Sequence, residues 1–432
     1  MDKKQFKDVT VMGLAMFAMF FGAGNLIFPS YLGNQAGTQW MLGFVFFVAA
    51  DAGLALLTVY CMIKTDRISI LDVNERLGKV VSLIVCTIVM LCTGPFFAAP
   101  RTAATSFEMG FLPLFPSLSS WVYGAIYFAI VLLCCFRRTG IIDIIGKFMT
   151  PALVLAIFIL VIIGIFKPIG EIVGEPQIAV IKEGIVSGYQ TMDVMAAITF
   201  VAIILDSCRE RGYTDKKHSL SLVLKASSVA AISLVVVYLG LAFLGATTSG
   251  IDAYRSYSEA ELLVTITEDL AGSGGVIILA VMVFLACLTS AIGQITLCAN
   301  YLVEIAHGKL SYRLVVIVIV IMSYFVSNVG LSTIISVTGP AMSALYPVLV
   351  FMLILNVFGG KIKNSNVFKC AALFSFLTAF CTDVLPLFGV TASFIKVFPL
   401  YSYGLAWILP GILGAAVGAL IPSKPYVRKI SG

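Results

Sequence analysis

Apolar runs of about twenty residues, separated by short polar segments, recur along the whole chain. About 20 helical residues cross a hydrocarbon layer of about 30 Å, so each run is long enough to span a bilayer. The pattern therefore predicts twelve membrane helices. They cover residues 8–31, 40–63, 80–109, 118–136, 141–166, 190–208, 221–246, 274–304, 313–329, 333–357, 366–388 and 400–421.

The composition agrees with this pattern. Of the 432 residues, 60% are hydrophobic and 12% are charged, and the mean hydropathy is +1.05. Soluble domains carry about 25% charged residues. We therefore expect an all-α polytopic membrane protein, with residues 1–432 forming a single transmembrane domain.

The basic residues are distributed very unevenly between the two sides of the predicted membrane. The side of the membrane that holds the N-terminus carries 23 of the 28 Lys and Arg residues, and the loops on the opposite side carry four. The remaining one, Arg101, lies inside a predicted span. Cytoplasmic loops are enriched in Lys and Arg, so both termini are predicted to be cytoplasmic. The net charge of +6 follows from this topology, and it does not indicate a nucleic-acid partner.

The sequence carries no motif for chemistry in water. There is no P-loop, no HExxH, no Ser/His pairing and no Cys/His cluster, and the ten cysteines include several within spans. An enzyme or an ATP-driven pump is therefore not expected, nor is an organic cofactor or an obligate protein partner. The remaining classes are a secondary transporter, a channel and a receptor, each with the lipid bilayer around it.

The first predicted helix contains polar and flexible residues at its middle. Gly22 and Gly24 flank Ala23 and are followed by Asn25. Glycine is poor in a helix interior, and unpaired backbone groups in hydrocarbon cost several kcal/mol unless they line a cavity or lie within the protein. We therefore predict that the helix unwinds here into two halves.

Such a break presents two kinds of binding group. The second half-helix directs its first amides, those of Ala23, Gly24 and Asn25, into the membrane, where they suit a carboxylate. The first half ends in free carbonyls near residues 18–21, which suit a cation. A cation-coupled symporter of amino acids needs both.

Two motifs resemble those of a known family. GAGNLIFP in helix 1 and GPFFAAPRTAATSFEMG (residues 94–110) in helix 3 are similar to the bacterial branched-chain amino acid:cation symporters, the BrnQ-type carriers of the LIVCS family. The resemblance implies an inner-membrane location and a LeuT-like fold. Two inverted repeats of five helices would cover residues 8–166 and 190–357, and two further helices would cover residues 366–421.

The resemblance also implies a site. Broken helices 1 and 6 would form its centre. Helix 6 lacks a Gly-x-Gly, so its break would fall at Ala196, Ala197 and Thr199. Leucine, isoleucine or valine would bind to Ala23, Gly24, Asn25, Phe96, Phe97, Met192, Ala196 and Phe200. Sodium would be held by hydroxyls and carbonyls of Ala18, Phe21, Ala286, Thr289 and Ser290.

Four charged residues in or near spans are candidates for gating or coupling: Asp51, Arg101, Lys147 and Asp193. Charged groups inside a membrane are functional candidates and need a partner. Arg101 could pair with Asp193 or Asp383 as an outer gate. Alternatively, Lys147 could couple transport to protons, and no sodium ion would then be needed. Symport with sodium and symport with protons both remain open.

Overall fold

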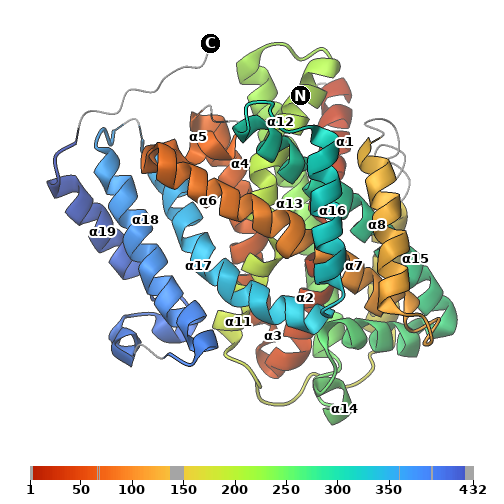
Figure 1. Ribbon diagram of the computed structural model, residues 1–432. Coiled ribbons are helices and arrows are strands. Elements are labelled where there is room, and N and C mark those ends of the chain that lie inside the picture. The colour runs from red at the N-terminus through yellow and green to blue at the C-terminus, as the bar shows by residue number, and fades with distance from the viewer. Residues whose placement is uncertain are drawn as a thin grey trace.

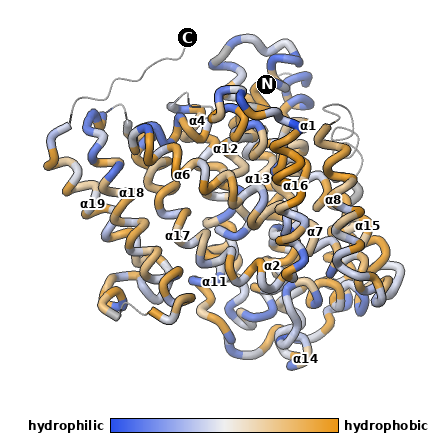
Figure 2. The backbone as a smooth tube through the Cα atoms, viewed as in Figure 1, coloured by the Kyte–Doolittle hydropathy of each residue, from blue (hydrophilic) through white to orange (hydrophobic). Residues whose placement is uncertain are grey.

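The computed structural model describes residues 3–65, 67, 69–136, 150–359, 361–390 and 393–423. Every regular element in these ranges is a helix, and the helices run side by side between two ends of the molecule (Figure 1). Hydrophobic residues fill the middle of the bundle, and hydrophilic residues gather at its two ends (Figure 2). This distribution is typical of a multi-pass membrane protein.

Six described helices are long and apolar enough to span a membrane, or seven if the bent pair Val180–Ile198 and Ile203–Glu210 counts as one span. Shorter apolar helices cover Ser120–Phe136, Val154–Phe166, Tyr312–Ser327 and Ile408–Leu420. The all-α membrane class is therefore confirmed. The count of twelve spans and the division into two repeats remain predictions.

The first two predicted spans consist of five elements. Their bounds are α1 (Lys3–Phe20), α2 (Ala23–Ala36), α3 (Trp40–Val48), a π-helical turn (Ala49–Gly53) and α4 (Leu54–Thr65). The next elements are α5 (Ile70–Asn74), α6 (Lys79–Leu91), a π-helical turn (Cys92–Phe96), α7 (Ala98–Ser106), a second such turn (Phe107–Phe111), α8 (Ser120–Phe136) and α10 (Thr150–Phe166).

The remaining α-helices include the longest of the described chain. Their bounds are α11 (Val180–Thr191), α12 (Asp193–Glu210), α13 (Lys216–Ala246), α14 (Asp252–Arg255), α15 (Glu259–Ile305), α16 (Tyr312–Ser327), α17 (Leu331–Val357), α18 (Ser365–Ala379) and α19 (Ile408–Leu420). In Figure 1 the start of α1, α5 and the α12–α13 connection lie at one end, and α14 lies at the other. This arrangement agrees with the predicted alternation of spans.

The span predicted at residues 80–109 covers Lys79–Phe111, but it is kinked, because Pro95 lacks an N–H and Gly94 adopts non-helical angles (φ −84°, ψ −105°). Two other predicted boundaries were wrong. Helix 6 begins at Val180 instead of residue 190. Helix 12 is α-helical only from Ile408, because Leu400 and Gly404 adopt left-handed angles before it.

Helix 8 also extends beyond its predicted start. The predicted span begins at residue 274, but α15 already begins at Glu259, and the chain bends at Gly272 (φ 64°). A positive φ is accessible to glycine at little cost, so Gly272 allows the outer arm of α15 to change direction. This arm carries the buried apolar residues Leu262, Leu263 and Ile266.

Helix α2 and helix α13 approach very closely. A Cβ at Gly33 would collide with the backbone of Ala242, and a Cβ at Gly245 would collide with the backbone of Ser30. Small residues allow membrane helices to pack backbone against backbone. This contact holds the second half of helix 1 firmly beside α13 and fixes the position of the break before it.

Candidate functional site

Helix 1 is interrupted between α1 and α2. Phe21 and Gly22 separate the two helices, and Gly22 is extended (φ −126°, ψ −162°). The backbone N–H of Gly22 donates to Oδ1 of Asn25 at 3.2 Å. The side chain of Asn25 therefore satisfies one of the amides that the break exposes, as an N-terminal cap does.

The side-chain nitrogen of Asn25, Nδ2, links the break to two other helices. It donates to Oδ2 of Asp193 at 3.0 Å and to the hydroxyl oxygen of Tyr238 at 2.5 Å. Asn25 is only 1% exposed. A buried polar side chain needs such partners, and here they join α2 to α12 and α13.

Helix 6 is interrupted at Met192, which adopts a left-handed conformation (φ 66°, ψ 19°) between α11 and α12. The prediction of a break at Ala196, Ala197 and Thr199 missed the left-handed turn at Met192, but the helix axis does bend by 47° beside Thr199, between Val180–Ile198 and Ile203–Glu210. A left-handed methionine is strained, so surrounding contacts must hold it in place.

One such contact comes from helix 2. The hydroxyl of Thr191 donates to Oδ1 of Asp51 at 2.7 Å. Asp51 is fully buried and lies in the π-helical turn Ala49–Gly53, a type of irregularity common at functional sites. The structure thus brings Asp51 and Asp193 to the same region, one on each side of the break.

Helix 8 faces the break in helix 1. A Cβ at Gly22 would lie 2.9 Å from Oγ of Ser290. The hydroxyl of Thr289 donates to the carbonyls of Leu285 (3.1 Å) and Ala286 (2.9 Å), and Oγ of Ser290 accepts from Gln294 at 3.1 Å. Phe21 is buried, and Ala18 and Ala286 are half-buried. Cation ligation by this group stays a prediction.

Arg101 reaches the same region from α7. Its Nη1 donates to the carbonyl of Gln190 at 2.5 Å, and its guanidinium lies 5.6 Å from the centre of the Phe28 ring. Within the described ranges, no carboxylate lies within 4.0 Å of Arg101. The predicted ion pairs with Asp193 and Asp383 are therefore absent there, and Asp383 instead pairs with Lys182 at 3.7 Å.

The predicted apolar pocket residues differ in their surroundings. Phe200 is buried, and its ring lies 5.1 Å from that of Phe20, edge to face. Met192 is buried as well, whereas Phe97 and Ala196 are half-buried against the same core. Phe96 is 39% exposed and lies outside this core, so its role stays a prediction. Lys147 lies outside the described residues.

Three polar residues of this region were not predicted. Gln190 and Thr191 lie at the predicted start of helix 6, where polar residues are expected in any case. Tyr238 is a single polar residue in the apolar run VVVYLG, so the sequence alone could have marked it as a candidate for the buried polar region. A buried tyrosine hydroxyl usually has a hydrogen-bond partner, and Asn25 is that partner here.

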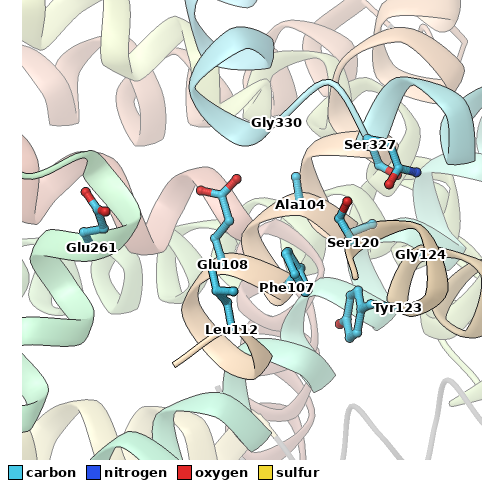
Figure 3. A pocket seen from close by; sticks show the side chains of 12 residues that line it. Ala104, Phe107, Glu108, Leu112, Ser120, Tyr123, Gly124, Glu261, Ser327 and Gly330 are labelled. Atoms are coloured by element: carbon cyan, nitrogen blue, oxygen red, sulfur yellow. The ribbon is translucent and has the colours of Figure 1, made fainter. Parts of the chain in front are cut away.

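A separate cavity of about 260 Å³ lies between α7, α8, α15 and the α16–α17 connection. Figure 3 shows Glu108 and Glu261 approaching it from different helices. Oε1 of Glu108 accepts from the backbone N–H of Leu331 at 2.9 Å. None of the predicted site residues lines this cavity.

Known proteins resemble this chain both in fold and in sequence. The structure resembles that of Mhp1, a nucleobase-cation-symport-1 family transporter, with a TM-score of 0.64 and 14% identity over 95% of this chain and 92% of that one. It also resembles a Na⁺-coupled sialic acid symporter, with a TM-score of 0.61 and 14% identity over 97% and 91%. The fold is therefore that of the LeuT-like transporters.

The sequence is more specific than the fold. Residues 5–424 match the family model described as branched-chain amino acid transport protein. The branched-chain amino acid permease BrnQ of Bacillus subtilis is 32% identical, with 96% of each chain covered, and BrnQ of Escherichia coli K12 is 33% identical, with 98% of each covered. The chain belongs to this family of branched-chain amino acid transport proteins, and it is a transporter rather than an enzyme.

Proposed function

We propose that the protein imports leucine, isoleucine and valine by symport with sodium through the inner membrane, with both termini cytoplasmic. The observation that carries this proposal is the contact of the helix 1 break with helix 8. Gly22 faces Ser290 directly, so amides and hydroxyls from two helices converge on one unwound turn. The sequence relatives named as branched-chain amino acid permeases support the choice of substrate.

The substrate binds along this turn. Its carboxylate accepts from the amides of Ala23, Gly24 and Asn25, which have no intrahelical acceptor in the first turn of α2. Its ammonium group meets backbone carbonyls of helices 1 and 6. Its side chain occupies the apolar region formed by Phe96, Phe97, Met192, Ala196 and Phe200. Such a pocket separates substrates that differ by one methylene by only about 1–3 kcal/mol, so all three amino acids share it.

Sodium binds on the opposite side of the same turn. Hydroxyls of Thr289 and Ser290 and carbonyls of Ala18, Phe21 and Ala286 offer neutral oxygens, which suit a hard monovalent cation. Both hydroxyl oxygens keep a lone pair after the hydrogen bonds described above. The cation would hold the unwound turn in the conformation that binds the substrate, and this shared turn couples the two fluxes.

Uptake of labelled leucine into proteoliposomes tests the proposal. An imposed sodium gradient should drive saturable uptake that excess valine inhibits, and a proton gradient alone should not. If saturable uptake is driven only by a proton gradient and is lost in Lys147→Ala, the coupling ion is a proton and not sodium. Uptake that responds to neither gradient would refute symport, and flux without saturation would indicate a channel.

A further inference from the structure

Arg101 is a buried cation with few partners. It is 3% exposed, and a guanidinium has five N–H donors. One of the two N–H groups of Nη1 donates to the carbonyl of Gln190, and Nε has no partner, as in Arg67 and Arg76. No carboxylate of the described chain lies within ion-pair distance. A buried charge without an ion-pair partner costs several kcal/mol, so this arrangement favours an anion beside it.

Two other buried arginines show what a structural arginine looks like in this protein. Arg67 forms an ion pair with Glu75 at 2.7 Å. Arg76 uses both terminal nitrogens on backbone carbonyls, Nη1 on Ile362 at 2.6 Å and Nη2 on Gly359 at 3.1 Å. Arg101 differs from Arg76 at Nη2, which makes no such bond.

The Nη2 atom of Arg101 faces the first turn of α2. It lies 3.2 Å from the position that a Cβ on Gly24 would occupy. Gly24 belongs to the first turn of α2, whose free amides carry the positive end of the helix dipole. Asp193 lies in the same region, but it lies beyond ion-pair distance from Arg101, and its Oδ2 accepts from Asn25. Two groups that favour an anion, the guanidinium and the first turn of α2, therefore lie side by side, and no carboxylate of the described residues pairs with Arg101.

We propose that Arg101 binds the carboxylate of the transported amino acid together with the first-turn amides of α2. This inference rests on the proposed function and adds a residue to its substrate site. A guanidinium and a carboxylate form charge-assisted, often bidentate hydrogen bonds, which an alcohol or an amine cannot reproduce. Arg101 therefore restricts transport to amino acids and rejects the corresponding amino alcohols.

The same contact connects the substrate to helix 6. Nη1 of Arg101 binds the carbonyl of Gln190, two residues before the break at Met192. A carboxylate on Nη2 would thus be joined through one side chain to the end of α11. Arg101 lies on helix 3 and contacts helix 6, and the bound carboxylate would link it to the first turn of α2 in helix 1.

Competition binding on the purified full-length protein tests the inference. Labelled leucine is displaced by unlabelled leucine, leucinol or leucinamide, in the wild type and in Arg101→Gln. Leucine should lose about 10- to 150-fold in affinity in Arg101→Gln, the range for a lost hydrogen bond to a charged group. Leucinol should lose little, so the preference for leucine over leucinol should collapse.

Matched variants separate recognition from folding. Arg76→Gln removes a buried arginine that donates to the backbone carbonyls of Ile362 and Gly359, and it should leave the leucine-to-leucinol ratio unchanged. Arg101→Lys keeps the charge and should retain part of the preference. Gly24→Ala would place a Cβ against Arg101 and the Phe28 ring without removing either, and it should lower leucine affinity more than leucinol affinity.

The outcomes are distinct. If Arg101→Gln weakens leucine and leucinol equally, or leaves leucine binding intact, the inference is wrong. If Arg101→Gln does not fold, Arg101→Lys and Gly24→Ala decide, since an unchanged ratio in both would overturn it. Absence of leucine binding by the folded wild type would instead refute the proposed function itself.

Discussion

Helix 1 breaks at Gly22, an extended glycine, whereas helix 6 breaks at Met192, a methionine in the left-handed region. The first break is capped from within its own turn, by Asn25 three residues later. The second is held from outside, because Thr191 bonds to Asp51 on helix 2 and Asp193 is held by Asn25 on helix 1. The two breaks thus have different causes, local in one case and tertiary in the other.

This difference has a functional consequence. A break set by glycine and a neighbouring cap leaves its remaining amides available for a ligand, and Ala23 and Gly24 lie in that position. A break held by side chains from other helices depends on those helices keeping their places. We therefore expect helix 1 to supply the amides that bind the substrate carboxylate, and helix 6 to respond to movements of its neighbours.

The largest effect is expected at the residue that the two breaks share. Asn25→Leu removes the cap of Gly22 and leaves Asp193 and Tyr238 without their common partner. Each buried polar group left unsatisfied costs about 1–3 kcal/mol, so both stability and leucine uptake should fall strongly. Thermal unfolding in detergent and uptake per folded molecule measure the two effects.

Asn356 provides a matched control on α17. It is also buried, and its amide donates to the carbonyl of Val73 at 2.8 Å, away from both breaks. Asn356→Leu should lower stability while leaving uptake per folded molecule nearly unchanged. If Asn25→Leu behaved in the same way, Asn25 would be a structural residue only.

A smaller effect is expected where helix 1 meets helix 8. Gly22 has ordinary extended angles, so alanine is unfavourable there only because its Cβ would lie 2.9 Å from Oγ of Ser290. Gly22→Ala should cost about 1–3 kcal/mol by overpacking. The double variant Gly22→Ala, Ser290→Ala should recover much of this stability. Equal unfolding temperatures for the single and the double variant would contradict the contact.

The smallest effect is expected at the tertiary support of helix 6. Thr191→Val keeps the shape of the side chain but removes the hydrogen bond to Asp51. It should cost about 1–2 kcal/mol in stability and reduce the maximal uptake rate more than the affinity for leucine. A selective loss of leucine affinity would show that Thr191 belongs to the binding surface instead.

The sequence predicted the break of helix 1 because its causes are neighbours in the chain. Gly22, Gly24 and Asn25 are adjacent, and their behaviour in hydrocarbon follows from local chemistry. The break of helix 6 could not be placed in the same way, because Asp51 lies 140 positions from Thr191 and no glycine marks the position. The break in helix 3 was accessible to sequence reasoning, since Gly94 and Pro95 are consecutive.

The sodium dependence of leucine binding in wild type and Ser290→Ala tests the central claim most directly, namely that one unwound turn holds both ion and substrate. Binding is measured on purified protein at several sodium concentrations, without any gradient. We expect leucine affinity to rise with sodium in the wild type, and Ser290→Ala to need about tenfold more sodium for the same affinity, as for a lost contact of about 1.4 kcal/mol. Leucine affinity that does not depend on sodium in either protein would contradict the account.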